Sequence, residues 1–265
     1  MLLRTLFCLG FPLLTILGLP ACQEPPLEQA AHSDPFAHIS DTTARSVLEK
    51  AMAAMGGLER WQSKKEIRFR KTYALLLENG EVESQASQQH LYSYDPKTDI
   101  QISWIKDGQS HLLQASDGKV TKSIEGKVDT SANPLSLGNT ILSATFVANL
   151  PYNLLDTGAE ISYAGLDTLE TGQLVHAVRI AYNPETHVNH STADIWWVYF
   201  DQQGYELVAY MVQHADHYSY VRNVSDTLVS GIRLVKDRKS WRVDSLRNPL
   251  YLRAQYAYRD YELAW

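Results

Sequence analysis

The segment EIRFRKTYALLLENGEVESQASQQHLYSY, residues 66–94, decides the fold that we expect of this chain. Ile67 and Phe69 open an alternation of apolar and polar residues, and a period of two is typical of a half-buried strand. Asn79-Gly80 then supplies a dipeptide that tight hairpin turns prefer, because both residues tolerate a positive φ. The segment therefore predicts two antiparallel strands joined by a short turn.

The same succession of strands and turns continues along the chain. Asp107-Gly108 and Asp117-Gly118 mark two further turns, so each expected strand follows its neighbour directly. Later strands are expected at residues 161–169, 174–182, 194–200, 205–213, 218–228, 232–236 and 250–261. The 15 Tyr and 6 Trp residues suit half-buried pleated surfaces. We therefore predict a mainly β (α+β) domain with a single antiparallel sheet.

Two segments have helical periodicity instead. Residues 42–55 place apolar side chains on one face, begin beside three residues that can cap a helix (40–42), and end at Gly56-Gly57. Residues 135–150 lie between two prolines and also space their apolar side chains at helical intervals. Three threonine and valine residues lower the helix propensity of the second segment, but a helix remains the expectation there.

The N-terminal residues predict export and lipidation. An apolar run too short for a membrane span, which needs about 20 residues, ends in Leu19-Pro20-Ala21-Cys22, a pattern that resembles the lipobox of bacterial lipoproteins. We expect residues 1–21 to be a signal peptide, residues 22–39 a flexible tether acylated at Cys22, and residues 40–265 the folded domain. An ordinary signal peptide is the alternative.

The residues after Cys22 bear on location and partners. Gln23 and Glu24 stand where an Asp would mark inner-membrane retention, so we expect an outer-membrane lipoprotein that faces the periplasm, with exposure at the cell surface left open. The net charge of −6 disfavours nucleic acid and anionic membrane surfaces as broad electrostatic partners. Removal of the signal would leave Cys22 as the one cysteine, which excludes a disulfide.

The paired tryptophans at 196–197 predict a strand that is apolar on both faces. If Phe200 pairs with Tyr205, Trp196 and Trp197 each lie among apolar neighbours from the next strand, on opposite faces of the sheet. If one face of the sheet were exposed to solvent, the apolar residues around either Trp196 or Trp197 would be exposed to water. A helix, another part of the chain or a ligand must therefore cover the second face.

Histidines near the open end of that hairpin are the candidates for a metal site, together with two aspartates: His187, His190, His214, His217, Asp194 and Asp216. Strand parity places His214 on the face opposite His190 and His217. A structural zinc site usually needs four protein ligands and a catalytic site about three. We therefore predict no metal ion and no other cofactor.

No common catalytic motif is present in the sequence. It lacks the nucleophile elbow, the phosphate-binding loop, the zinc-protease helix motif and the EF-hand loop. Acidic residues such as Glu160, Asp167 and Glu170 lie near expected strand ends. Acidic residues at such positions commonly end the pairing between strands and have no catalytic role. We predict that the protein is not an enzyme, with a hydrolase as the less favoured alternative.

Several motifs resemble those of one family. They are MGGLERW (55–61), LPYNLLDTG (150–158), Gly172, YNP (182–184) and WWVYFD (196–201). In this arrangement they are similar to uncharacterised Bacteroidetes-type lipoproteins related to the periplasmic carriers and receptors of lipoprotein localisation. The resemblance implies an open, strongly curved antiparallel sheet, an incomplete barrel, with helices covering a concave side that can hold acyl chains.

Five apolar residues are the predicted ligand-binding set: Tyr94, Trp104, Phe146, Leu150 and Trp197. Each could equally be an ordinary core residue, and the hypothesis depends on the surplus of apolar surface around the sheet. The expected function is binding of a lipid or another apolar molecule. The alternative is an accessory or interaction lipoprotein whose concavity is filled by its own helices.

Overall fold

A computed structural model describes residues 34–155, 158–183 and 194–265 of the chain. The chain divides into two units, Met1–Asp34 and Pro35–Trp265, and the fold below is that of the second unit. The predicted signal peptide, Cys22 and residues 22–33 of the predicted tether lie outside the described residues. No helix among the described residues has the length and apolar character needed to span a membrane.

The described residues form helices and one large sheet. The helices are α1 (Thr42–Ala54), α2 (Leu58–Ser63) and α3 (Pro134–Ala148), with a 3-10 turn η1 (Tyr152–Leu155). The strands are β1 (Glu66–Leu76), β2 (Val82–Ser93), β3 (Asp99–Lys106), β4 (Gln109–Ser116), β5 (Lys119–Ile124), β6 (Lys127–Val128), β7 (Ala159–Thr168), β8 (Leu174–Tyr182), β9 (Ile195–Asp201), β10 (Leu207–Gln213), β11 (Tyr218–Val229), β12 (Ile232–Val243) and β13 (Pro249–Ala264).

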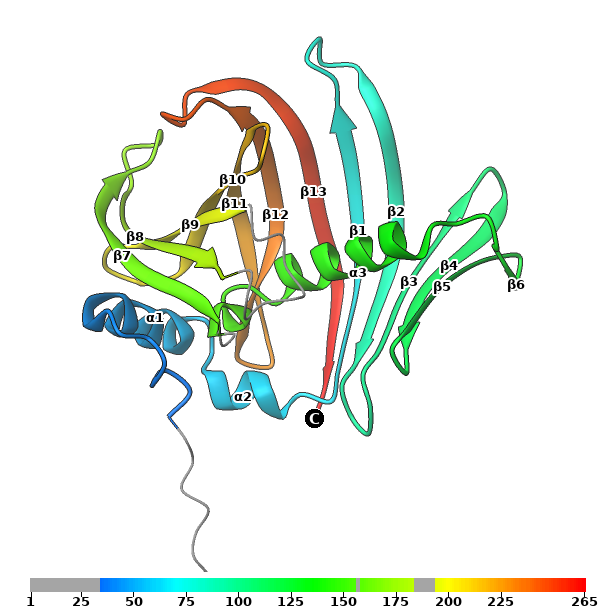
Figure 1. Cartoon of the computed structure of the whole chain (residues 1–265), viewed down its shortest axis with the longest axis horizontal. Coiled ribbons are helices and arrows are strands. Elements are labelled where there is room, and N and C mark those ends of the chain that lie inside the picture. Colours follow the sequence, from blue (N-terminus) through cyan, green and yellow to red (C-terminus); the bar gives the residue numbers. More distant parts are fainter. Residues whose placement is uncertain (1–33, 156–157, 184–193) are drawn as a thin grey trace, which may run out of the picture. The chain divides into compact units, whose positions relative to one another are not determined.

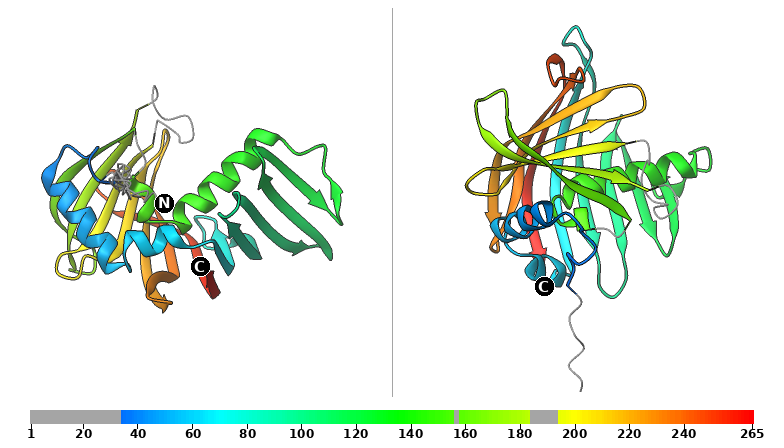
Figure 2. Two further views of the ribbon diagram at one scale, coloured as in Figure 1. Left: turned by 90° about the horizontal axis from the view of Figure 1, so that it is seen from below. Right: turned by 60° about the vertical axis from the view of Figure 1, so that its left-hand side comes forward.

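The strands form one open antiparallel sheet in the order β6-β5-β4-β3-β2-β1-β13-β12-β11-β10-β9-β8-β7. Neighbours in the sheet are neighbours in sequence except at the centre, where β1 pairs with the last strand, β13. The sheet curves around α3, which crosses its concave side (Figures 1 and 2). The predicted fold class, a single open and curved antiparallel sheet with helices on the concave side, is confirmed.

The predicted hairpins are confirmed with their turn chemistry. Ile67 lies opposite Tyr92 in the first hairpin, and Gly80 in its turn has a φ of 85°. In Asp107-Gly108 both residues have positive φ, 52° and 77°, as a type I′ turn requires. Strand β12 is longer than predicted, because the charged residues 236–239 continue it where the sequence pattern suggested an end.

Helix α1 is fixed to the edge of the sheet by its capping residue. Asp41 Oδ1 accepts hydrogen bonds from the N–H groups of Thr43 and Ala44 at 2.9 and 3.0 Å. Its Oδ2 accepts the N–H of Tyr163 in edge strand β7 at 2.8 Å. These bonds, that of Tyr163 first, lower the pKa of Asp41 below its usual value. One carboxylate thus caps α1 and also accepts a backbone N–H group of the edge strand β7.

The register of β9 and β10 differs from the expected one. Leu207, not Tyr205, lies opposite Phe200, and an irregularity follows before Ala209. The reason is the turn: the carboxylate of Asp201 accepts the N–H groups of Gln203 and Gly204 at 2.9 and 2.7 Å. Tyr205 therefore belongs to the turn, with a φ of 61°, and the strand starts later.

Apolar residues are buried on both sides of β9 and β10, as predicted. Trp196 belongs to the main core on the concave side, whereas Tyr199 belongs to a second cluster on the outer face. Arg247 covers that second cluster, with its guanidinium 5.1 Å from the ring centre of Tyr199. Its Nη1 donates to Asp167 at 2.7 Å. The chain itself therefore covers the outer apolar face in part.

Candidate ligand-binding cavity

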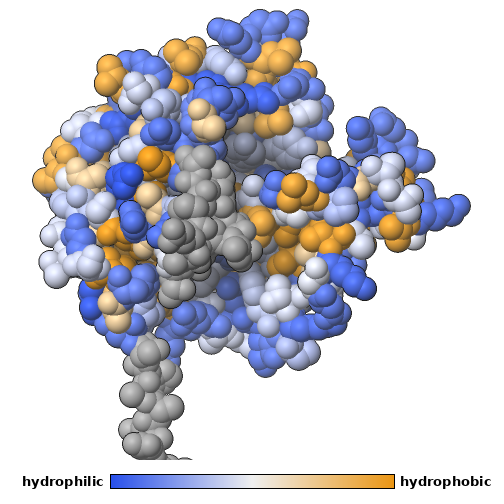
Figure 3. Space-filling model, in the orientation of Figure 1, coloured by the Kyte–Doolittle hydropathy of each residue, from blue (hydrophilic) through white to orange (hydrophobic). Residues whose placement is uncertain are grey.

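Two adjoining cavities lie between α3 and the concave face of the sheet. Their volumes are about 740 and 590 Å³, and pockets for small molecules usually span about 300–1,000 Å³. They share six lining residues: Asn139, Ser143, Val147, Tyr210, Val221 and Tyr256. The space-filling view shows the surface hollowed beside α3, with apolar residues gathered around the helix (Figure 3).

One row of side chains crosses the floor of the larger cavity because of the strand register. Tyr258 of β13 lies opposite Lys71 of β1, and Lys71 lies opposite Gln88 of β2. Gln88 in turn lies opposite Trp104 of β3. Directly opposite residues in antiparallel strands share a face, so the row places two polar side chains between two aromatic ones along the cavity. Trp104 ends the row stacked on His111 of β4, with ring centres 5.2 Å apart.

Helix α3 supplies the other wall. Ser136, Asn139, Thr140 and Ser143 line the larger cavity at intervals of three and four residues, so they share one side of the helix. Asn133 caps the helix start by accepting the N–H of Leu135 at 2.9 Å. The wall formed by α3 is therefore polar from Ser136 to Ser143, and Leu135, Ala144 and Val147 make its two ends apolar. The sheet supplies apolar floor residues, among them Ile102 and Leu113.

Lys71 and Arg238 are the charged residues of the larger cavity, and no carboxylate is among its described lining residues. Arg238 is 4 % exposed. Its Nε donates to Asn223 Oδ1 at 2.8 Å, and its Nη1 donates to the carbonyl of Val147 in the last turn of α3 at 2.9 Å. Burial raises the pKa of Tyr256, on the strand beside it, to about 12. That phenol therefore stays protonated and able to donate a hydrogen bond.

The structure brings together two of the five predicted ligand residues. Trp104 lines the larger cavity and Phe146 the smaller one, where it packs on Trp196 with ring centres 4.7 Å apart. Leu150 is buried in the adjoining core. The hydroxyl of Tyr94 donates to Asn149 just after α3 at 3.2 Å. Tyr94 and Leu150 thus support the helix and do not line either cavity.

The expected place of Trp197 in the concavity is wrong. Successive residues of a strand point to opposite faces, and Trp196 is the one that points inward. Trp197 packs with the second apolar cluster on the outer face, where it lines a groove of about 510 Å³ with Tyr218 and Leu246. Trp196 holds the inward position that was assigned to its neighbour.

Sequence reasoning missed the two cations of the cavity. A signal existed for Lys71, because it has the same parity in β1 as the inward residues Ile67 and Phe69. No such signal existed for Arg238, because the strand was expected to end at Lys236. A charged residue at an inward strand position is the feature to look for in similar sequences.

The parity assigned to the histidines is also wrong. His214 and His217 close a tight turn, in which the N–H of His214 donates to the carbonyl of His217 at 2.8 Å. Their rings therefore share a face, with centres 4.4 Å apart. His214 pairs with Asp194 at 3.0 Å and His217 with Asp216 at 2.6 Å. Within the described part of the chain, no three potential ligands are grouped for a metal ion, and His187 and His190 lie outside that part.

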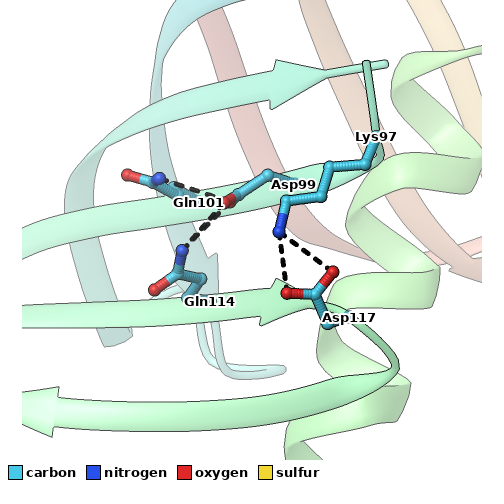
Figure 4. Close-up of polar contacts among 5 residues, drawn as sticks. All are labelled: Lys97, Asp99, Gln101, Gln114 and Asp117. Atoms are coloured by element: carbon cyan, nitrogen blue, oxygen red, sulfur yellow. Dashed lines mark hydrogen bonds and ion pairs between the residues drawn. The ribbon is translucent and has the colours of Figure 1, made fainter. Parts of the chain in front are cut away.

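A polar cluster at the ends of β3 and β4 has a structural role (Figure 4). Lys97 Nζ contacts both carboxylate oxygens of Asp117 at 3.0 and 2.7 Å. The Nε2 of Gln114 donates to both oxygens of Asp99, and that of Gln101 donates to one of them at 3.2 Å. These contacts link neighbouring strands and a loop, so the two carboxylates stabilise the hairpin ends.

Comparison with known proteins gives the class of fold. No family model matches the chain, and no curated protein matches it in sequence. A DUF1329 family protein from Desulfovibrio piger has a similar structure, with a TM-score of 0.54 and 10% sequence identity, over 83% of this chain and 92% of that chain. This likeness shows a shared fold. The open sheet that the sequence resemblance implied is the fold observed.

Two further solved structures are similar over nearly the same range. One is a putative outer membrane lipoprotein-sorting protein domain from Vibrio parahaemolyticus, with a TM-score of 0.49 and 9% identity over 82% of this chain and 91% of that chain. The other is a LolA superfamily protein from Nitrosomonas europaea, with a TM-score of 0.48 and 8% identity over 83% of this chain and 93% of that chain.

Proposed function

We propose that the concave side of the sheet binds an apolar or amphipathic small molecule, such as one with an acyl chain, without chemical change. The observation that carries this proposal is the pair of adjoining cavities under α3, about 740 and 590 Å³ in volume. A helix that served to fill the concavity would turn apolar side chains towards the sheet along its whole length. Here Ser136, Asn139 and Ser143 line the gap instead.

Apolar groups at the cavity supply the driving force for such binding. Leu135 of α3 lines the larger cavity although its side chain is 73% exposed, and Leu142 lines the smaller one at 41%. Trp104 and Ile102 lie on the floor. A ligand that covers these side chains gains about 25 cal/mol for each Å² of apolar surface removed from water. That gain needs few exact hydrogen bonds.

We propose further that the protein is an outer-membrane lipoprotein anchored through Cys22, with its domain facing the periplasm. The lipobox-like Leu19-Pro20-Ala21-Cys22 supports this. Each buried acyl methylene contributes about 0.8 kcal/mol, so several chains on one cysteine would give lasting attachment. If the Cys22→Ser variant is still acylated and still retained at the membrane, this location is contradicted.

A cavity-filling variant tests the binding proposal. Ser143 lines both cavities, so Ser143→Trp should fill the space that a ligand needs. We expect binding of N-phenyl-1-naphthylamine, measured by fluorescence titration, to weaken about tenfold or more, which corresponds to about 1.4 kcal/mol. Thr121→Trp is the matched control, because Thr121 is exposed on β5 and lines neither cavity.

The same titration separates the proposal from its alternative. A wild-type chain that binds no apolar probe would mean that the cavity is not a ligand site, and the accessory lipoprotein with a filled core would then be preferred. Equal binding by wild type and Ser143→Trp would place the probe elsewhere. Thermal unfolding of both variants shows whether a loss of binding is a loss of fold.

A further inference from the structure

We infer that the ligand of the larger cavity carries an anionic head group, a carboxylate or a phosphate, which binds between Arg238 and Lys71. This inference rests on the proposed function and names the class of molecule that the cavity takes. It depends on two buried or half-buried cations that have no carboxylate partner, on the polar groups around them, and on the apolar surface that continues from them.

Arg238 is a buried cation whose described hydrogen-bond and ring partners are all neutral. The side chain is 4 % exposed, and it is held by an amide oxygen of Asn223 and the backbone carbonyl of Val147. The faces of Tyr210 and Tyr258 lie 5.8 and 5.6 Å from its guanidinium carbon. Within the described part of the chain no carboxylate forms a salt bridge with it. These neighbours orient the guanidinium but do not supply a negatively charged carboxylate.

Two more exposed arginines near the same end of the chain do have acidic partners. Arg259 of β13 is 36% exposed at its side chain and contacts Asp237 at 2.6 Å, and Arg247 is 17% exposed and contacts Asp167 at 2.7 Å. A buried charge costs more than an exposed one unless it is paired. Arg238 is the most buried of these three arginines, and it lines the cavity without a described acidic partner. An anionic ligand would supply the counter-charge.

Lys71 gives the cavity a second cation. Its Nζ lies 5.2 Å from the ring centre of Tyr256 and 5.7 Å from that of Tyr73, and no described carboxylate pairs with it. Lys71 is on β1 and Arg238 on β12, with β13 between them. Adjacent strands are about 4.8 Å apart, so the two backbones are separated by about 10 Å. Two long side chains that start at this separation can contact one small anion.

The surroundings of the two cations suit an anion. The net charge is −6, yet the charged residues that line the larger cavity are both basic. Tyr256, Asn139 and Ser143 add groups that can donate hydrogen bonds near them. Arginine and lysine are also the side chains that recognise carboxylate and phosphate groups in proteins.

The remainder of the cavity suits an apolar tail. Trp104, Ile102 and Leu113 continue the floor away from the cations, and Leu135 lies at the rim. Lys71, Gln88 and Trp104 form one cross-strand row, so polar and apolar surface follow each other along the sheet. An amphiphile with one anionic head and one apolar tail matches this order, whereas a free phosphate ion would leave the apolar part uncovered.

Four probes with the same tail test the inference: hexadecanoate, hexadecyl phosphate, hexadecanol and hexadecyltrimethylammonium. Titrations with the full chain, below the concentration at which each probe aggregates, should show both anions binding about tenfold or more tighter than the alcohol and the cation. Inorganic phosphate alone should bind much more weakly than hexadecyl phosphate. Tight binding of inorganic phosphate without a tail would instead indicate a site for the free ion and would overturn the inference.

Two variants tie the preference to the two cations. Lys71→Met and Arg238→Met should each reduce anion binding about tenfold or more while hexadecanol binding stays within about twofold, and Arg238→Lys should keep most of the preference. Lys236→Met is the control, because Lys236 is exposed on the same strand and lines neither cavity. If Arg238→Met fails to fold, the head-group series and Lys71→Met decide the question.

The outcomes distinguish the inference from the function on which it rests. Equal affinity for the alcohol and the anions, or an anion preference that survives both Lys71→Met and Arg238→Met, would overturn the inference and leave a general apolar site. No binding of any of the four probes would overturn the proposed function as well.

Discussion

At the scale of single residues, His90 shows how the fold changes the chemistry of a side chain. It is 1% exposed and stacks on Phe69 with ring centres 4.7 Å apart. One ring nitrogen lies 2.8 Å from the hydroxyl of Tyr92. Burial lowers the pKa of His90 to about 3, and the positive charge of Lys71 adds to the effect. The imidazole is therefore neutral in the folded protein near neutral pH.

This shift predicts a pH dependence of stability. In the unfolded chain a histidine takes up its proton near pH 6.5, whereas folded His90 resists protonation until about pH 3. The unfolded state then binds more protons between these values, so the free energy of unfolding falls as the pH drops below 6.5, by at most about 1.4 kcal/mol per pH unit. Above pH 6.5 this contribution does not change.

His90→Gln removes this titration and provides the comparison. Between pH 7 and pH 5, denaturant unfolding should show a decrease in stability that is smaller in the variant by about 2 kcal/mol. His214, His217 and other titrating groups are common to both proteins, so the difference belongs to position 90. An identical decrease in both proteins would show that His90 is not the group responsible.

The limits of sequence prediction at this scale are clear from two neighbouring pairs. Alternation predicted that Trp196 and Trp197 face opposite sides, but it could not tell which side is concave, and the wrong one was chosen. For His214 and His217 the error came from extending strand parity through a turn. Parity holds only within continuous pairing, and the sequence does not show where pairing is interrupted.

At the scale of elements, the end of α1 depends on a close backbone contact. Gly56 has a φ of 117°, and a Cβ atom placed there would lie 2.4 Å from the carbonyl oxygen of Gly231 in the turn between β11 and β12. The N–H of Arg233 donates to the carbonyl of Met55 at 2.9 Å beside this contact. Only glycine allows the helix end to approach the turn so closely.

Gly56→Ala should therefore destabilise the protein by more than about 3 kcal/mol, since it adds a clash to backbone strain. Gly57→Ala is the matched control: its φ is 94°, but a Cβ atom there would have no neighbour within 4 Å. The control should cost only the backbone strain of its positive φ, about 1–3 kcal/mol. Thermal or urea unfolding measures both, and equal losses would mean that the contact with Gly231 is not important.

Elements were predicted well where local signals are strong. The helix start at Asp41 and the turn at Asn79-Gly80 followed from capping and turn chemistry, and both are observed. The prediction of β12 failed because residues 236–239 are charged, and a charged run normally indicates solvent. Arg238 lies in that run, so the functional hypothesis of the cavity depended on the part of the sheet that was hardest to predict.

At the scale of the whole domain, the two halves of the sheet are joined through the last strand. β13 pairs with β1 over Glu66↔Ala264 to Leu75↔Ala254, and with β12 on its other side. Turn signals describe only neighbours in sequence, so this pairing of the ends could not be predicted from them. It brings Lys71 of β1 and Arg238 of β12 to the same cavity.

Removal of β13 is therefore expected to abolish the fold, and not merely to shorten the sheet. A chain that ends at Asn248 would leave one edge of β1 and one edge of β12 without a partner strand and would lose Tyr258 and Ala254 from the buried interior. Two exposed strand edges beside apolar surface favour aggregation.

The control ends at Ala264 and lacks only Trp265, which is 45% exposed and lies outside the strand. We expect the control to stay soluble and to unfold in one transition near the wild-type temperature. The chain that ends at Asn248 should instead be insoluble or lack a cooperative transition in circular dichroism. If it unfolds cooperatively, strands β1 to β12 do not need β13 to form a stable sheet, and the central role of the last strand would be wrong.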